Sequence, residues 1–500
     1  MKTDEQFWAE FPDIAEAALK TWDAPSVGIG VIKDGKVVFS GGFGLRDVEN
    51  RLKSDGQTLY MIGSCTKSFT AALCGIFADK GLVDLETPIR KYVPEVELMD
   101  PLANRECTLK DLLSHRTGLP RHEYSWYGTD YTREQMADHM RYFEPSQPFR
   151  QTFQYCNYGY ILAGYILEKI SGKTWEQLIS EYIFEPLDMK RSTYYLETMK
   201  EDGNHAEPYA HEKAGGGQTG MERIPFFVSP VEDREKGIGT PLGPAGSIYS
   251  DAEDMLNYVN MFLNRGKAGE TQVISEAMVT ELTKGQIMRN NPLDLPNPET
   301  EMMTYACGWF AEFFRGHKLL QHGGNINGFS GFTSFMPDLN LGIVAYTNMD
   351  SCFVHFALAR TIYDHYLGAE GGNWVNRYHD FVKESHDQLP VLLKAFTGEQ
   401  VPYTAPSHPI EEYTGTYRRD GYSDMAIRLE EGRLVMDFIG AVIKLDHYHY
   451  DTFVTADIVG ELPGGMPVHF SAAYVGGKIE TLRMPLVTEA GGELVCFKKV

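Results

Sequence analysis

Hydrophobic positions at the start of the chain predict a β-hairpin followed by a buried helix. Two apolar segments within residues 26–40 flank Asp34-Gly35, a pair favoured by tight type I′ turns, so these residues are expected to form the hairpin. The apolar run from Ser68 to Lys80 is typical of a buried helix. The glycine that follows this run is suited to end a helix.

Helical and strand-like patterns then alternate over most of the chain, which is typical of a mixed α/β domain. Ile343 to Tyr346 is expected to form a buried strand, and Asn373 to about Phe396 a helix. The polar, proline-rich stretch from Thr397 to Pro409 predicts a linker. We therefore expect one large domain over residues 1–396, followed by a linker over residues 397–409.

The pattern changes after about residue 410. Short strand-like runs are separated there by turn signals that contain glycine: Glu431-Gly432, Gly464-Gly465, Gly476-Gly477 and Gly491-Gly492. This spacing favours a small antiparallel β-barrel or sandwich over residues 410–500.

Composition limits the classes of function. The net charge of −23 disfavours nucleic acids and anionic membranes as partners, since both bind basic surfaces. The seven cysteines are scattered without a C-x-x-C pair, which is typical of free thiols in a reducing compartment. The N-terminus lacks the features of a secretion signal, and the longest apolar run, Tyr158 to Leu167, is too short to span a bilayer. We expect a soluble, cytoplasmic protein.

The most informative motif is Ser64-Cys65-Thr66-Lys67, where an extended segment gives way to the predicted helix. Residues three apart on a helix lie on one face, so the Lys67 amine can reach the Ser64 hydroxyl. A serine hydroxyl is a weak nucleophile, and a partly desolvated lysine beside it can act as its base. The Ser64 N–H at the first helical turn is also free to face an oxyanion. Alone, the tetrapeptide is more typical of a helix-capping serine and a surface lysine, so other motifs must support the chemistry.

Two downstream motifs supply further groups. Tyr155-Cys156-Asn157 precedes an apolar helical run, and His322-Gly323-Gly324-Asn325 opens a glycine-rich stretch. A phenol can carry a proton between nucleophile and leaving group, while a carboxamide can bind a substrate carbonyl and orient the lysine. Alone, Tyr155 is more typical of an aromatic residue packed at a helix start.

Together these motifs resemble those of a known family. Class C β-lactamases and the related D-alanyl-D-alanine carboxypeptidases and esterases carry three such motifs in the same order, here Ser64-x-x-Lys67, Tyr155-x-Asn157 and His322-Gly323-Gly324. Three further stretches resemble supporting segments of this family: Leu112 to Pro120, Gly243 to Ser250, and Gly308 to Phe310. The resemblance spans roughly residues 8–370.

The resemblance implies both a fold and a site. It implies an α/β fold with an antiparallel sheet flanked by helices, an all-helical subdomain beside it, and the catalytic cleft between them. Ser64 would be acylated, with Lys67 and Tyr155 sharing the roles of general base and proton relay. Asn157 would hold the acyl amide or carbonyl, and the Asn325 N–H would join that of Ser64 as the oxyanion hole. No cofactor is implied.

The third motif departs from the family pattern. Relatives usually carry Lys-Thr-Gly or His-Thr-Gly, in which the cation and the hydroxyl help to bind a substrate carboxylate. Here His322 replaces the lysine and Gly323 removes the hydroxyl, and a neutral imidazole is a poor carboxylate clamp at pH 7. We therefore expect esters, amides or peptides without an obligatory carboxylate rather than β-lactams. Cys156, where serine is common, is interpreted as a tolerated substitution.

The C-terminal region resembles the lipocalin-like domain attached to some of these hydrolases, through Tyr413 to Tyr417 and His447 to Phe453. His447 and His449, two apart on a strand, lack the further ligands of a metal site, so we assign them a structural role and expect no metal. In relatives this domain shapes the cleft entrance or the oligomer, which leaves a homo-oligomer open.

A loop-rich stretch over residues 196–240 falls where the family places substrate-lining loops. Five aromatic residues in or near such loops either line an acyl pocket or anchor the loops to the core: Tyr124, Trp126, Tyr127, Phe226 and Phe227. The sequence leaves both interpretations open.

Three functions are compatible with these motifs. The first is a serine hydrolase that acts through a Ser64 acyl-enzyme on a small ester, amide or (D-)peptide. The second is an acyltransferase or peptide cyclase with the same first step, and the third is a non-catalytic receptor with the same fold. The presence of Lys67 and Tyr155 favours the first two, since a receptor often loses such residues.

Overall fold

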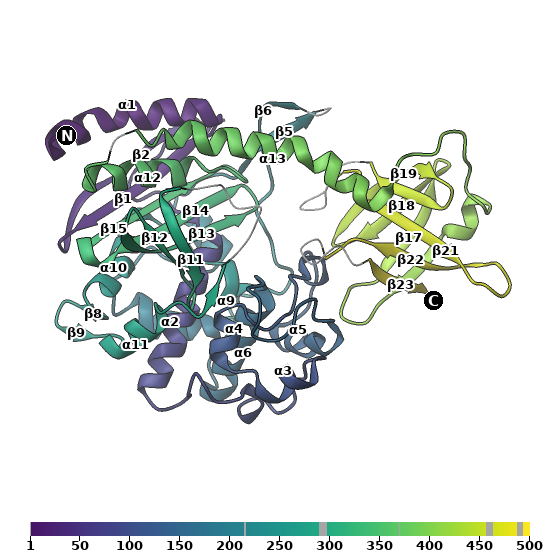
Figure 1. Ribbon diagram of the computed structural model, residues 1–500, viewed down its shortest axis with the longest axis horizontal. Helices are drawn as coiled ribbons and strands as arrows, with labels where there is room; N and C mark the ends of the chain where they lie inside the picture. Colours follow the sequence, from purple (N-terminus) through teal and green to yellow (C-terminus); the bar gives the residue numbers. More distant parts are fainter. Residues whose placement is uncertain (1, 215–216, 290–297, 370, 457–463, 488–493) are drawn as a thin grey trace.

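The chain folds into two parts that one long helix joins. The computed structural model describes residues 2–214, 217–289, 298–369, 371–456, 464–487 and 494–500. A large mixed α/β part precedes α13 (Trp374–Thr397), and a closed barrel follows it (Figure 1). The predicted fold class, an antiparallel sheet flanked by helices and followed by a small all-β barrel, is confirmed.

Within the described residues, nine strands form one antiparallel sheet in the order β10-β11-β12-β13-β14-β15-β1-β2-β3. Their bounds are β1 (Ser26–Lys33), β2 (Lys36–Asp47), β3 (Leu52–Lys53), β10 (Ile287–Met288), β11 (Thr300–Tyr305), β12 (Phe310–Phe314), β13 (His317–Ile326), β14 (Phe329–Met336) and β15 (Leu341–Thr347). The strand predicted at residues 343–346 lies within β15, which is buried along its whole length.

The predicted hairpin is formed by β1 and β2. Asp34 and Gly35 have φ angles of 52° and 72°, both in the left-handed region that a type I′ turn needs. Strand β2 runs on to Asp47, well past the predicted end at residue 40. The prediction ended too early because glycines interrupt the apolar pattern after residue 40. At Gly42 a side chain would meet the Asp55 backbone nitrogen at 2.5 Å, so the crossing of a neighbouring segment requires glycine.

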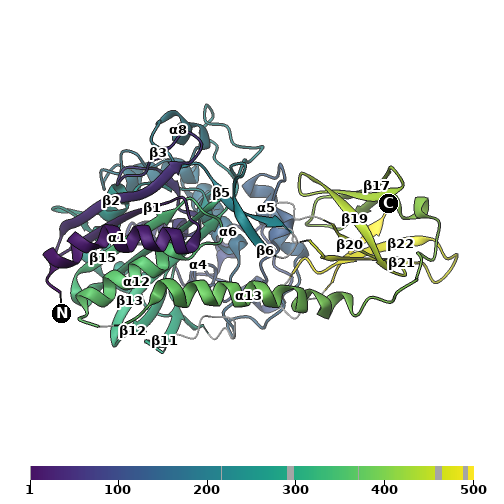
Figure 2. The ribbon, with the colours of Figure 1, turned by 90° about the horizontal axis from the view of Figure 1, so that it is seen from above.

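Helices cover both faces of this sheet. On β1, Val27, Ile29 and Val31 belong to a core shared with α1 (Asp4–Trp22) and α12 (Val354–Tyr366). Figure 2 shows these two helices and α13 on the same face. Between Ile29 and Val31, Gly30 leaves room on the opposite face of the sheet for Leu256 of α10 (Ala252–Leu263). This alternation of branched residues and glycine along β1 lets helices pack closely on each side.

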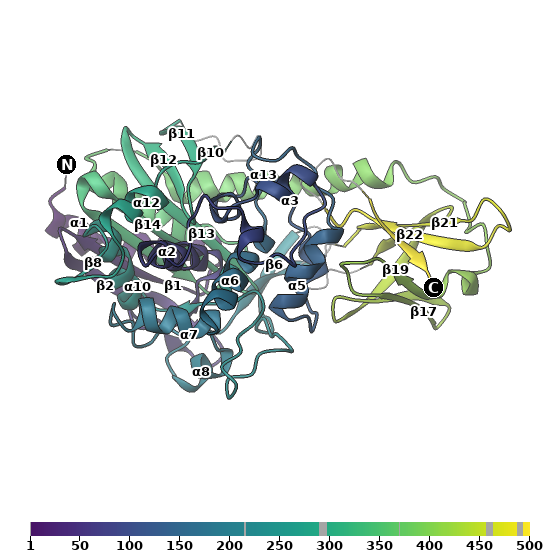
Figure 3. The same ribbon diagram turned by 90° about the horizontal axis from the view of Figure 1, so that it is seen from below.

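The helical subdomain lies on the α10 side of the sheet (Figure 3). Its central helices are α2 (Thr66–Asp79), α6 (Asn157–Ser171) and the short α9 (Gly243–Gly246). The other helices of the described chain are α3 (Pro101–Glu106), α4 (Leu109–Leu113), α5 (Arg133–His139), α7 (Trp175–Ile179), α8 (Leu196–Glu201) and α11 (Glu276–Leu282). Helix α2 is buried from Thr66 to Phe77, and Gly81, with φ of 69°, follows its end as predicted.

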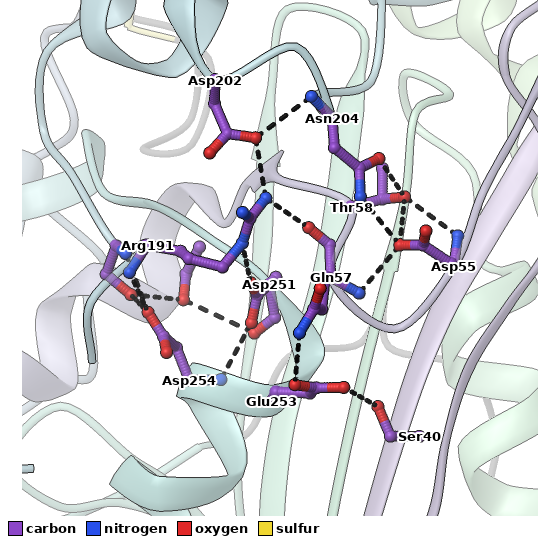
Figure 4. A network of polar contacts seen from close by, with 12 residues as sticks. Ser40, Asp55, Gln57, Thr58, Arg191, Asp202, Asn204, Asp251, Glu253 and Asp254 are labelled. Atoms are coloured by element: carbon purple, nitrogen blue, oxygen red, sulfur yellow. Dashed lines mark hydrogen bonds and ion pairs between the residues drawn. The ribbon is translucent and has the colours of Figure 1, made fainter. Parts of the chain in front are cut away.

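A polar network fixes the segment that leads into α2 (Figure 4). Two short strands, β4 (Tyr60–Met61) and β7 (Tyr249–Ser250), pair just before the turn Gly63–Cys65 that carries Ser64, the predicted nucleophile. Arg191 joins the chain on both sides of this pair, donating to the Gln57 carbonyl oxygen at 2.8 Å and to the Asp251 carboxylate at 2.8 Å. Asp251 in turn caps the N-terminus of α10 through the Asp254 N–H. With a third hydrogen bond, to Asp202 at 2.7 Å, one guanidinium holds three separate segments in register.

The barrel is closed by eight strands in the described residues, which confirms the sequence prediction. They are β16 (Gly415–Arg418), β17 (Met425–Glu430), β18 (Arg433–Phe438), β19 (Ala441–His449), β20 (Thr452–Thr455), β21 (Pro467–Ala472), β22 (Ile479–Met484) and β23 (Val495–Lys499). The predicted turn at Gly491-Gly492 lies outside the described residues. His447 and His449 contact backbone atoms of Tyr450 and Val401.

The stretch 196–240, predicted as loops, holds regular structure. It begins with α8 and contains a hairpin of β5 (Tyr209–Ala214) and β6 (Gly217–Arg223). Its polar, glycine-containing strands lack the apolar alternation that identifies a strand in sequence. A small hairpin of β8 (Lys267–Ala268) and β9 (Thr271–Gln272) follows α10.

The cysteines are free, as the sequence predicts. All seven cysteines are unpaired, and six of them are buried. Among the helices of the described chain, none combines the length and the apolar character needed to cross a membrane.

A buried ion pair between strand β12 and helix α12 is expected to be sensitive to single substitution. The exposed fractions of Glu312 and Arg360 are 0% and 3%, and the two side chains meet at 2.5 Å. Glu312→Leu leaves an uncompensated buried guanidinium and should destabilise this part by about 3–5 kcal/mol. Thermal unfolding of the variant measures this. The double variant Glu312→Leu/Arg360→Met should lose less stability, because it leaves no buried charge unpaired. An equal or larger loss of stability would show that the unpaired guanidinium is not the cause.

Candidate active site

Ser64 lies in a tight turn immediately before α2. It occupies the 3₁₀ segment Gly63–Cys65, so the regular helix begins two residues after it, at Thr66. Gly63 has φ of 53°, and a side chain there would meet the Asn325 nitrogen at 2.9 Å. Both the left-handed backbone and this close approach require glycine. The turn leaves Ser64 partly exposed, whereas the neighbouring Lys67 is fully buried.

The Lys67 amine contacts three oxygen atoms from three elements. Its Nζ lies 3.1 Å from Ser64 Oγ and donates hydrogen bonds to Asn157 Oδ1 at 2.6 Å and to the Ala245 carbonyl oxygen at 2.7 Å. Burial lowers the pKa of Lys67 well below its usual value, and the nearby Glu123 carboxylate opposes this shift. The predicted approach of Lys67 to Ser64 is therefore present.

Tyr155 lies beside this pair. A hydrogen bond links its hydroxyl to Ser64, and its ring centroid is 4.8 Å from Lys67 Nζ. Burial raises the pKa of Tyr155 above that of a free phenol, so the hydroxyl keeps its proton at neutral pH. The His115 ring packs at 4.3 Å on one side, and the Arg121 guanidinium lies 5.0 Å from the ring centroid. His115 also accepts the Cys156 N–H at 3.1 Å, which ties it to the Tyr155-x-Asn157 motif.

Asn157, the first residue of α6, bridges Lys67 to a residue that the sequence reasoning missed. Its Nδ2 donates to both carboxylate oxygens of Glu123, at 2.8 and 3.1 Å, while its Oδ1 accepts from Lys67. Glu123 also pairs with Arg121 at 2.9 Å. Glu123 is a single acidic residue outside any periodic pattern, so the sequence did not identify it as part of the site. Its position soon after the family-like stretch Leu112 to Pro120 was the only signal that could have identified it.

The third motif lies on β13, alongside the nucleophile turn. Gly324 faces this turn so closely that a side chain there would overlap the Ile62 carbonyl oxygen. The Asn325 side chain accepts from Ser330 Oγ at 2.9 Å and the Ser351 N–H at 3.0 Å. These contacts leave the Asn325 backbone, rather than its carboxamide, beside the turn.

His322 is a neutral, buried imidazole. Its Nε2 lies 3.0 Å from the Tyr305 hydroxyl, and its Nδ1 lies 2.6 Å from the Gly323 carbonyl oxygen. Burial and the nearby Lys67 lower the pKa of His322 to about 3, so it carries no charge at pH 7. This state agrees with the expectation that His322 is a poor carboxylate clamp. Tyr305, its hydrogen-bond partner, was not singled out from the sequence.

Three of the loop aromatics, Trp126, Tyr127 and Phe227, contact one another. Phe227 packs against Tyr127 at 5.7 Å and Trp126 at 6.3 Å, and Phe226 packs against Phe329 at 6.1 Å. The Tyr127 hydroxyl accepts a hydrogen bond from Asn327 Nδ2 at 2.8 Å, two residues beyond the third motif. These rings anchor the loops, and a role in lining an acyl pocket stays a prediction. No group of three or more potential metal ligands occurs among the residues described.

The comparison with known families settles the class of protein. The family model described as Beta-lactamase matches residues 11–363. The chain belongs to the β-lactamase family. A second family model, a domain of unknown function named DUF3471, matches residues 399–498 and so includes the barrel. With its hydrolase relatives, this assignment makes the protein a serine hydrolase of the β-lactamase family.

Relatives and solved structures agree with this assignment. The chain is 28% identical to the unguisins hydrolase ungD of Aspergillus violaceofuscus over 493 residues, covering 92% of this chain and 84% of that protein. It resembles the octameric penicillin-binding protein homologue of Pyrococcus abyssi with a TM-score of 0.62 and 23% identity, over 98% of this chain and 100% of the other. It also resembles the D-amino acid amidase of Ochrobactrum anthropi SV3 with a TM-score of 0.56 and 21% identity, over 76% and 99% of the two chains. At these identities the structural similarities establish the fold.

The close packing of Gly324 predicts a test of the site geometry. Gly324→Ala should force β13 away from the nucleophile turn and slow acylation of Ser64 about 100-fold, because a displacement near 1 Å has that order of effect. Gly323→Ala is the matched control, since its new methyl group meets the Phe356 ring at 3.0 Å, which can shift, and the Gly331 carbonyl oxygen at an ordinary contact distance of 3.7 Å. Burst kinetics with a p-nitrophenyl ester measure both. Equal effects of the two substitutions would show that the close approach of Gly324 to the Ser64 turn does not set the geometry of the site.

Proposed function

We propose that the protein acylates Ser64 with a small ester, amide or D-residue peptide and then hydrolyses the acyl-enzyme. The set of contacts around Lys67 Nζ carries this proposal. A neutral amine has two hydrogens and one lone pair. Two carbonyl oxygens, from Asn157 and Ala245, accept the two hydrogens, so the lone pair faces the Ser64 hydroxyl. This arrangement suits removal of the Ser64 proton.

The opposite pKa shifts of the two candidate bases favour a division of roles. Lys67, with its lowered pKa, is the base that accepts the Ser64 proton as Oγ attacks the substrate carbonyl carbon. Tyr155, with its raised pKa, relays a proton to the leaving group as the tetrahedral intermediate collapses. The N–H groups of Ser64 and Asn325 hold the oxyanion in this proposal. Water then attacks the acyl carbon and gives one proton to the same groups, which pass it to Ser64 Oγ as the bond between that oxygen and the acyl carbon breaks and the acid product leaves.

The surroundings of the site support the proposed substrate class. Because His322 is neutral and Gly323 has no hydroxyl, the third motif provides neither of the groups that bind a carboxylate in β-lactam hydrolysis. The similarity to a D-amino acid amidase favours amide substrates. Acyl transfer would begin with the same acyl-enzyme and differ only in that an acceptor other than water attacks it. One experiment therefore measures both reactions.

Mass spectrometry of the intact protein tests the acyl-enzyme. After incubation with p-nitrophenyl esters or D-alanine p-nitroanilide, one acyl adduct is expected on Ser64, with nitrocefin turned over slowly. Ser64→Ala should lose about 1000-fold or more in turnover. Ser68→Ala is the matched control, because the Ser68 hydroxyl donates to the Cys65 carbonyl oxygen within the same helix start. Retained turnover in Ser64→Ala, or rapid nitrocefin hydrolysis, would contradict the proposal. The product ratio with added amine separates hydrolysis from acyl transfer.

The protonation of Lys67 predicts the pH dependence. Only the neutral amine accepts a proton, so kcat/KM should fall as pH decreases through the lowered pKa of Lys67. His322 is already neutral at pH values above about 3, so its protonation cannot produce a limb near neutrality. The kcat/KM profile of the wild type is therefore compared with that of His322→Gln, whose acid limb should keep the same midpoint. A limb that disappears in His322→Gln would show that the histidine, not Lys67, titrates.

A further inference from the structure

Two neighbouring residues connect the C-terminal barrel to the Lys67 site. His122 has φ of 49°, in the left-handed region, and immediately precedes the 3₁₀ segment Glu123–Ser125. This backbone places the His122 side chain against the barrel, while Glu123 reaches Asn157 on the opposite side. Left-handed backbone is uncommon outside glycine, although histidine tolerates it better than most residues. Contacts on both sides must therefore stabilise this conformation.

On the barrel side, the contact is a buried hydrogen bond. The Tyr422 hydroxyl, from the β16–β17 turn, lies 2.6 Å from His122 Nδ1. The His122 ring stacks on Phe143 at 4.2 Å, and the Tyr422 ring packs edge-on against the same phenylalanine at 6.0 Å. A second contact lies six residues on, where Gly128 meets the Ile439 carbonyl oxygen so closely that only glycine fits. Two barrel turns thus hold one loop, near the end of α5 that faces the barrel in Figure 3.

On the site side, Glu123 determines which way the Asn157 carboxamide points. A carboxylate only accepts hydrogen bonds, so the amide nitrogen of Asn157 must face Glu123. The amide oxygen is then directed to Lys67, at 2.6 Å. If Glu123 moved away, the carboxamide would be free to rotate and present its N–H₂ group to the amine.

We propose that the barrel is a positioning element for the acylation machinery. The Tyr422 hydroxyl holds His122, and the adjacent Glu123 consequently keeps the Asn157 amide oxygen on Lys67. This inference rests on the proposed function, because the contact matters only if Lys67 is the base for Ser64. Tyr422, His122 and Glu123 are positioning residues, since they act through Asn157.

The loop is also held from within the α/β part, which limits the expected effect. Ser125 Oγ lies 2.7 Å from the Tyr158 hydroxyl and donates to the His122 carbonyl oxygen at 2.6 Å. Loss of the Tyr422 hydroxyl should therefore loosen the loop without unfolding it. We expect a decrease in acylation rate of about tenfold, the order of effect that follows from imperfect alignment of a reacting group.

The charges around Lys67 give a second observable. The Glu123 carboxylate raises the pKa of Lys67 and Arg121 lowers it, so displacement of Glu123 should move the acid limb of kcat/KM to lower pH. The other titratable groups around Lys67 are Cys65, His115, Tyr155, Cys156 and His322. Burial and nearby charges keep Cys65, His115, Tyr155 and His322 neutral near pH 7 in the proposed resting state, so Glu123 and Arg121 are the charged neighbours through which a movement of the loop changes the pKa of Lys67.

A double-mutant cycle tests the inference on the full-length protein. Tyr422→Phe removes only the hydroxyl, and Tyr417→Phe is the matched control, because its hydroxyl is buried in the same barrel but binds the Tyr413 carbonyl oxygen at 2.8 Å. Acylation of Ser64 by a p-nitrophenyl ester should slow about tenfold in Tyr422→Phe, with the acid limb at lower pH, and stay unchanged in Tyr417→Phe. In the Glu123→Gln background, Tyr422→Phe should add no further effect.

Each outcome has a distinct meaning. If Tyr422→Phe behaves like Tyr417→Phe, or if its effect multiplies with that of Glu123→Gln, the inference is overturned while the proposed function stands. Absence of a Ser64 adduct in the wild type would overturn the proposed function and, with it, this inference. If Tyr422→Phe folds poorly, His122→Asn replaces it, since asparagine tolerates the left-handed backbone but lacks the imidazole that meets Tyr422.

Discussion

A lysine amine buried out of contact with water destabilises a protein unless each of its polar positions has a partner. Lys67 meets this requirement with Ser64 from its own helical turn, Asn157 from the start of α6 and Ala245 from α9. These partners lie far apart in the sequence, so α2, α6 and α9 must pack together before the amine is satisfied. The same packing removes water from Lys67 and lowers its pKa, so the packing that satisfies the buried amine also suits it to its proposed role as a base.

Close backbone contacts at glycine complete the site. Gly63 and Gly324 face each other across the gap between the nucleophile turn and β13, where no side chain would fit. Their contact brings the Asn325 nitrogen beside the turn that carries Ser64. The third motif therefore contributes mainly through its backbone, which explains how it tolerates a neutral His322 and a glycine in place of a hydroxyl residue.

The barrel extends this arrangement through the contacts of its turns. Its interior is filled by apolar side chains such as Tyr417, Met436 and Phe497. Its turns instead meet the loop that carries His122 and Glu123. A family of hydrolases that share one catalytic motif set can change such loop contacts without altering the motifs, since function depends on the site and its surroundings more than on the fold.

The sequence by itself determined the features that depend on local geometry. Ser64 and Lys67 are one helical turn apart, Asp34-Gly35 forms a two-residue turn, and glycine-containing turns such as Glu431-Gly432 and Gly476-Gly477 separate described barrel strands, so periodicity and turn chemistry sufficed. Only the tertiary structure decided the partners of these residues. Glu123, His115 and Tyr305 reach the site from loops and strands without a periodic pattern, and β2 continues past residue 40 through its pairing with β1. Contacts between distant segments arise from packing in three dimensions, which leaves no regular spacing along the chain.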